Sequence, residues 1–203
     1  TLVVPPTLLI SGCAPVPDLG KLKGIDLKQP GNLLYLAGAT LPALGGSLLH
    51  EMLEEPGGTL PGLDEKLAPE ILRRLHEGTL LGLWASLHDC SDGGLAVAVV
   101  EMALTSPFGV SLDLRPALAA SPGLDEVSCL FSESLTRLVV EVPPALAPQA
   151  EALFRGLPFL RLGEVSDLSV LEVKDRAGQA FLLDHLSELT GPWRKRLRKE
   201  MEG

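Results

Sequence analysis

The chain has 203 residues, of which 46% are apolar and 4% aromatic, so it can bury a core made mainly of Leu, Val and Ala side chains and is not a disordered chain. A net charge of −9 argues against nucleic acid as a partner, because binding a phosphate backbone needs clustered Lys and Arg. No apolar run is long enough to span a bilayer, no signal peptide is recognisable, and the three separated cysteines form no C-x-x-C pair, so we expect a cytoplasmic protein without membrane contact, disulfide framework or zinc site.

The beginning of the chain indicates a fragment of a longer polypeptide. It starts with Thr1 rather than Met, and its first ten residues are typical of an interior strand. The Pro5-Pro6 pair interrupts this run, which suits an edge strand or a crossing between domains. We therefore expect residues 1–29 to be an extended segment that crosses from a preceding domain, and residues 30–203 to form the domain itself.

Apolar runs and helical spacings alternate along the rest of the chain. Short apolar runs bounded by Gly, Pro and Asn predict strands, and apolar residues three or four apart predict helices. The predicted strands are residues 33–38, 80–87, 110–114, 135–142, 160–165, 169–173 and 180–183. The predicted helices are residues 48–53, 69–78, 95–103, 148–154 and 183–199, with residues 115–125 as a connection. A closing hairpin breaks a pure βαβ order, so the predicted fold class is α/β (α+β), with a layered mixed sheet covered by helices.

Two glycine turns each join a predicted strand to a predicted helix. Glycine lets a ligand approach the main chain closely, and a helix N-terminus attracts anions. The turns therefore predict a wall for a phosphate or a ribose, formed by Gly45, Gly46, Ser47, Ser91, Asp92, Gly93 and Gly94. Ordinary capped turns between a strand and a helix have the same pattern, so a purely structural interpretation also stays open.

Polar residues near the strand ends are further candidates. Glu133 precedes a predicted strand, where it can contact a ligand or simply solvate an edge. His88 and Asp89 follow a strand, a common place for catalytic groups. Adjacent residues on a strand point to opposite faces, however, so a triad of these two with Ser47 is not expected. The other histidines lack metal-ligand spacing, and we expect no metal site in this chain.

Four stretches resemble the phosphoribosylformylglycinamidine synthase family in order and spacing. The most specific one is residues 88–98 with Glu101, which resembles a signature of that family. The others are Pro6–Ile10 with Val16–Asp18, Pro30–Leu36 with Leu44–Ser47, and Leu130–Ser134 with Arg137–Val142. Together they cover most of the chain. Cys90 departs from the pattern, since that position is usually aliphatic.

The resemblance implies one domain of an ATP-dependent carbon–nitrogen ligase of purine biosynthesis. That enzyme converts formylglycinamide ribonucleotide to the amidine with glutamine-derived ammonia, and the chain is similar to its C-terminal domain, of the AIR synthetase type. Nothing in the chain matches the family's catalytic histidines, magnesium ligands or ATP contacts. We therefore assign no catalytic residue, and expect ATP and Mg²⁺ to serve the full-length enzyme while the fragment alone is inactive and binds neither.

The resemblance also implies partners and leaves alternatives. The implied partners are the ribonucleotide substrate, the N-terminal domains of the same polypeptide, a separate glutaminase and small accessory subunits. One alternative is a non-catalytic packing domain whose glycine turns bind no ligand, and another is a stand-alone anion-binding protein. Binding is favoured if both turns and Glu133 converge on one open cleft, whereas packing is favoured if they are buried or face apart.

Overall fold

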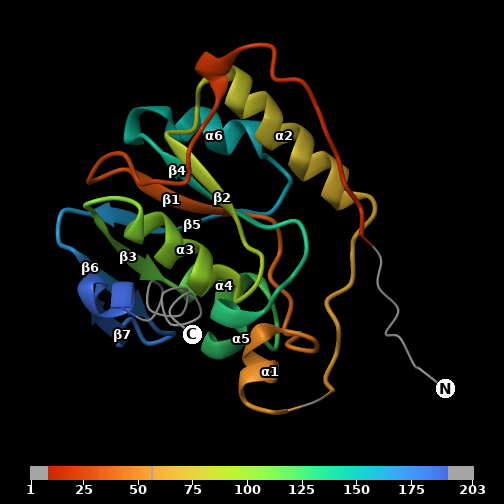
Figure 1. Cartoon of the computed structure of the whole chain (residues 1–203), viewed down its shortest axis with the longest axis vertical. Coiled ribbons are helices and arrows are strands. Elements are labelled where there is room, and N and C mark those ends of the chain that lie inside the picture. The colour runs from red at the N-terminus through yellow and green to blue at the C-terminus, as the bar shows by residue number, and fades with distance from the viewer. Residues whose placement is uncertain (1–8, 56, 192–203) are drawn as a thin grey trace, which may run out of the picture.

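The computed structural model describes residues 9–55 and 57–191, which are built around a seven-stranded sheet (Figure 1). The strands are β1 (Leu33–Ala37), β2 (Ser86–Asp89), β3 (Gly109–Asp113), β4 (Leu138–Val142), β5 (Phe159–Ser166), β6 (Val170–Lys174) and β7 (Ala180–His185). Their order across the sheet is β2-β4-β1-β5-β3-β6-β7. Neighbouring strands are antiparallel, except for β3 and β6, which run parallel. The predicted mixed α/β fold is confirmed.

Helices cover both faces of the sheet (Figure 1). The helices are α1 (Leu48–Met52), α2 (Leu67–Leu81), α3 (Gly94–Leu104), α4 (Arg115–Ala120), α5 (Glu126–Phe131) and α6 (Ala147–Leu153). Short 3₁₀ helices are formed by Leu19–Lys21 and Pro144–Leu146. Helices α3, α4 and α5 pack on one face and α2 and α6 on the other, which makes three layers with a core on each side of the sheet.

The central strand β1 supplies both cores. Leu34 and Leu36 belong to the core under α3, α4 and α5, whereas Leu33, Tyr35 and Ala37 belong to the core under α2 and α6. Successive side chains of a strand point to opposite faces, so a strand covered on both sides must be apolar throughout. This is why the unbroken apolar run of residues 33–37 predicted a buried strand correctly.

Helix α2 does not end at Gly78, and the predicted end of this helix is wrong. The helix continues to its C-cap at Gly82, which has a φ of 72°. Gly78 instead makes room for the indole of buried Trp84, since a Cβ atom there would lie 2.0 Å from Trp84 Cζ2. Because residues 80–81 finish the helix, the strand predicted for residues 80–87 starts only at β2.

Three further predictions differ from the structure. The predicted connection 115–125 contains α4, and the sequence patterns missed α5, which Asp125 caps by accepting a hydrogen bond from Ser128 N at 2.6 Å. The strand predicted for residues 135–142 begins only at β4. The closing helix predicted for residues 183–199 begins at residue 186, after β7. Its residues 192–199, like the predicted strand's residues 1–8, lie outside the described residues.

Buried Glu141 on β4 fastens the segment that precedes β1. Its carboxylate accepts hydrogen bonds from the main-chain amides of Lys28 (3.0 Å to each oxygen) and Gln29 (3.2 Å). It also accepts hydrogen bonds from Asn32 Nδ2 at 2.7 Å and Ser86 Oγ at 2.6 Å. The last residues of the predicted crossing segment are thus bound to the sheet, while the division at residues 29 and 30 stays a prediction. Over the described ranges, no helix has the length and apolar character needed to cross a membrane.

Candidate functional site

The candidate residues gather at one end of the sheet. Ala37 at the end of β1 pairs with Leu138 at the start of β4, and Leu138 also pairs with Asp89 at the end of β2. Because these strands are antiparallel, the segments after β1 and β2 meet the segment before β4 at the same end. Those three segments contain both glycine turns and Glu133.

Glu133 joins the two glycine turns. Its Oε1 accepts hydrogen bonds from Gly93 N at 2.9 Å and from Leu48 N at 2.8 Å. Gly93 precedes α3 and Leu48 is the first residue of α1, so both amides belong to helix N-termini. A carboxylate of the chain itself therefore occupies the position at which the turns were predicted to hold an external anion.

The two turns open onto different clefts. Ser91 and Asp92 are exposed and line a cleft of about 410 Å³, which we call the Ser91 cleft, together with Leu72, Asp89, Cys90, Glu133, Ser134, Leu135, Thr136, Arg137 and Leu138. Gly46 and Ser47 line a second cleft of about 340 Å³, the Ser47 cleft, with His50, Glu51, Glu54, Glu55 and Gly57. The turns and Glu133 thus come together as a unit, but they do not share one open cleft.

Several candidate residues serve the fold directly. The main chain packs so closely that a Cβ on Gly45 would lie 2.7 Å from the Thr59 carbonyl, and one on Gly94 would lie 2.4 Å from Ser132 O. The buried hydroxyl of Ser47 donates to Leu44 O at 2.7 Å and accepts from His50 N at 3.3 Å, which caps α1. These three residues match the packing interpretation of the turns.

A chain of polar contacts runs from the Ser91 cleft to α3. Ser91 Oγ donates to Asp89 Oδ2, Asp89 Oδ1 lies 3.3 Å from His88 Nδ1, and His88 Nε2 lies 2.7 Å from Glu101 Oε2. The hydroxyl of Ser91 holds the pKa of Asp89 below its usual range. His88 and Asp89 thus contact each other at the end of the strand, although adjacent residues within a strand point to opposite faces. A triad with Ser47 is still not formed, because the Ser47 hydroxyl donates to a main-chain carbonyl.

Arg137 is a buried cation that the sequence patterns did not identify. Its guanidinium donates to Ser134 O through Nε at 3.1 Å, to Thr40 Oγ1 through Nη1 at 3.0 Å, and to Ser132 O through Nη2. The side chain is only 1% exposed, and burial lowers its pKa. Its position in the motif before β4 was visible in the sequence, but its burial was not, because arginine in such a position is usually solvated.

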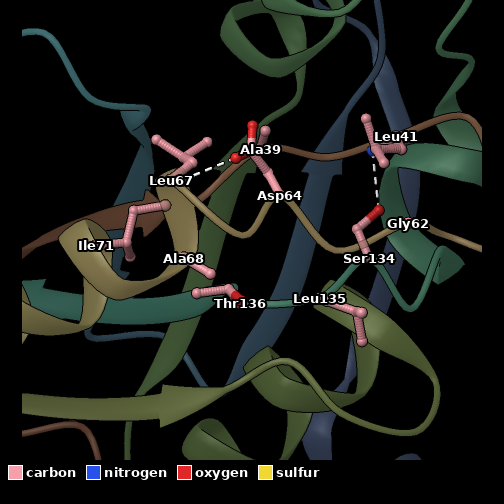
Figure 2. Close-up of a pocket in the computed structure, with 10 residues that line it drawn as sticks. All are labelled: Ala39, Leu41, Gly62, Asp64, Leu67, Ala68, Ile71, Ser134, Leu135 and Thr136. Carbon is pink, nitrogen blue, oxygen red and sulfur yellow. Dashed lines mark hydrogen bonds between the residues drawn. The ribbon is translucent and has the colours of Figure 1, made fainter.

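A smaller cavity of about 110 Å³ adjoins the Ser91 cleft (Figure 2). Ser134, Leu135 and Thr136 line both hollows and so form the wall between them. Asp64 lies in this cavity and accepts hydrogen bonds from Leu67 N, at the start of α2, at 2.9 Å and from Lys66 N at 3.0 Å. Those hydrogen bonds lower the pKa of Asp64. Within residues 9–55 and 57–191, no group of three or more His, Cys, Asp or Glu side chains is placed to share a metal ion.

Comparison with known families identifies a domain match. Residues 29–176 match the family described as AIR synthase related protein, C-terminal domain. The phosphoribosylformylglycinamidine synthase subunit PurL of Synechocystis sp. is 31% identical over 97% of this chain and 26% of its own length. The subunit of the same name from Streptomyces coelicolor is 35% identical over 83% of this chain and 22% of its own length. The chain thus spans about a quarter of the length of these curated relatives.

Solved structures share the fold. T. maritima PurL complexed with FGAR aligns with a TM-score of 0.73 at 22% identity, over 84% of this chain and 30% of that chain. HypE of E. coli, a hydrogenase maturation protein, aligns with a TM-score of 0.56 at 19% identity, over 80% of this chain and 52% of that chain. The structures support the predicted fold, and the curated relatives confirm the predicted resemblance.

Proposed function

Because the chain belongs to the family of C-terminal domains of AIR synthase related proteins, we propose that it is the C-terminal domain of a phosphoribosylformylglycinamidine synthase. The whole enzyme converts formylglycinamide ribonucleotide to the amidine at the expense of ATP, with ammonia released from glutamine as the nitrogen donor. The observation that carries this proposal is the family match across residues 29–176, together with relatives of that name along nearly the whole chain. We expect the chain alone to be inactive, because nothing in its sequence matches the family's catalytic histidines, magnesium ligands or ATP contacts.

The Ser91 cleft is the part of this chain that contacts substrate in our proposal. Its wall carries the carboxylates of Asp89, Asp92 and Glu133, which accept hydrogen bonds from hydroxyl groups and repel phosphate. The amide of Gly93, which could have bound a phosphate, already donates to Glu133. Of the two ligand groups predicted for this wall, a ribose hydroxyl therefore fits and a phosphate does not.

ATP and Mg²⁺ bind elsewhere in the whole enzyme under this proposal. A triphosphate needs free amide donors and cationic side chains, whereas the Ser91 cleft presents carboxylates and an arginine whose guanidinium already donates to the protein itself. The described residues thus do not fit an ATP site at this cleft. The N-terminal domains, a glutaminase and small accessory subunits complete a cytoplasmic enzyme.

A packing role is the second candidate function, and it applies to part of the proposed wall. The close contacts at Gly45 and Gly94 and the capping hydroxyl of Ser47 favour it. On this interpretation the glycine turns only shape the domain and its contacts.

Replacing Ser91 by Ala in the complete polypeptide that carries this domain separates the two functions. If the hydroxyl helps to bind substrate, KM for the ribonucleotide should rise about threefold to tenfold, because one hydrogen bond to the substrate is lost. The kcat and the melting temperature should stay unchanged. Ser111→Ala is the matched control, because Ser111 Oγ also donates to a carboxylate, Glu172 Oε2 at 2.7 Å, but lies on β3. An unchanged KM with a lower melting temperature for Ser91→Ala would assign Ser91 to packing.

A further inference from the structure

A single carboxylate oxygen holds two segments that are far apart in the sequence. Glu133 Oε1 binds Leu48 N, 85 positions earlier, and Gly93 N, 40 positions earlier. Hydrogen bonds to an ionised acceptor are stronger than those between neutral groups. The start of α1 and the turn before α3 are therefore tied to the same atom, although one borders the Ser47 cleft and the other lies next to the Ser91 cleft.

The residues on both sides of Glu133 fix its position. Ser132 and Ser134 are buried and bond to each other through their hydroxyls at 2.8 Å. Ser132 Oγ also donates to Ala43 O at 3.0 Å, and Ser134 Oγ accepts from Leu41 N at 2.9 Å, as Figure 2 shows for the second contact. The loop that carries Glu133 is thereby bonded to the segment after β1.

Arg137 also holds the same loop in place through hydrogen bonds. Its guanidinium donates to the carbonyls of Ser132 and Ser134, which flank Glu133. Among the described residues, no carboxylate accepts a hydrogen bond from Arg137, so the buried cation serves main-chain carbonyls and one hydroxyl instead of an ion pair. A buried charge is costly unless its donors are used, so this arrangement strongly favours one path for the loop.

The loop path is also strained. Thr136 has a φ of 59°, which a β-branched residue rarely adopts. Gly38, at a φ of 99°, lets the loop approach, because a Cβ there would lie 2.3 Å from Thr136 O. Such conformations persist only where the surrounding contacts determine them, and here Arg137 and the two serines supply those contacts.

We propose that Glu133, held in place by Arg137, is a positioning residue that couples the two glycine turns, so that the Ser91 cleft and the Ser47 cleft change shape together. The coupling passes through Oε1, because both amides bind that atom. It does not depend on the ligase activity proposed above, and its test uses the chain without any substrate.

The first measurement is amide hydrogen exchange in the chain, followed by NMR. In Glu133→Gln the acceptor loses its charge, and we expect exchange at both Leu48 and Gly93 to accelerate about tenfold or more while amides of β1 keep their protection. Arg137→Lys keeps the charge but loses the forked donor, and it should accelerate the same two amides. Glu126→Gln is the matched control, since Glu126 contacts Arg176 and neither turn. A change at only one of the two amides, or at neither, would overturn the proposal.

The second measurement tests the coupling with Glu133 intact. Ser47→Ala removes the cap of α1, and it should shift the amide signal of Gly93 in the wild-type background. In the Glu133→Ala background the same change should leave the Gly93 signal in place, because the oxygen shared by the two amides is no longer there. An equal response in both backgrounds, or no response in either, would contradict the coupling.

Discussion

Replacing Glu141 by Ala should destabilise the domain strongly, because four donors converge on this carboxylate. Asn32 Nδ2 would be left buried without a partner at a cost of about 1–3 kcal/mol, and the amides of Lys28 and Gln29 would add about 0.5–1 kcal/mol each. The buried Ser86 hydroxyl would also lose its acceptor. The other three donors alone give an expected loss in the free energy of unfolding of about 2–5 kcal/mol.

Urea denaturation of the variants measures this loss. Glu141→Gln keeps one acceptor oxygen and should lose only about 1 kcal/mol, the difference between charged and neutral acceptors. Glu164→Ala is the control, since its carboxylate is 57% exposed on β5 and should change stability by less than about 0.5 kcal/mol. If Glu141→Ala lost no more than Glu164→Ala, relief of a buried charge would offset the lost hydrogen bonds, and the fastening of the segment before β1 to the sheet would be refuted.

Two other predictions concern the core. Gly78→Ala should lower the free energy of unfolding by about 1–2 kcal/mol, because the new methyl group would overlap the indole of Trp84. This loss should exceed the gain of about 1 kcal/mol that alanine brings to a helix. A variant that is more stable in urea denaturation would contradict this packing. Burial raises the pKa of the Cys90 and Cys129 thiols to about 11. At pH 8 a thiol reagent should therefore modify exposed Cys13 quickly, and the two buried cysteines only after unfolding. Fast reaction of all three cysteines in the native chain would contradict the burial of Cys90 and Cys129.

The elements with clear periodicity were predictable from the sequence. Strand β1, helix α3 and the closing hairpin have clear local apolar patterns. These patterns predict the elements without knowledge of which residues pack against them. The end of α2 was not predictable, because Gly78 has the local features of a helix stop and only the indole of Trp84, packed against it, explains the glycine. Helices α4 and α5 have six residues each, too few turns for an amphipathic period to be recognised.

The candidate site was predictable in its residues but not in its contacts. The glycine turns and Glu133 were found from their positions at predicted strand ends, and the structure brings them together. The hydrogen bonds from Leu48 N and Gly93 N to Glu133 could not be predicted, because nothing in the local sequence indicates contacts between residues 85 and 40 positions apart. The role of Arg137 was equally hidden, because its donors bind carbonyls and one hydroxyl that only the folded loop places around it.

The most direct test of the proposed function is an assay of amidine formation from formylglycinamide ribonucleotide, ATP, Mg²⁺ and ammonia, with the product identified by mass spectrometry. The complete polypeptide that carries this domain should form the amidine in an ATP-dependent reaction, and the chain of 203 residues alone should form none. Absence of product with the complete polypeptide, or turnover by the chain alone, would contradict the assignment of this chain as a non-catalytic C-terminal domain of that ligase.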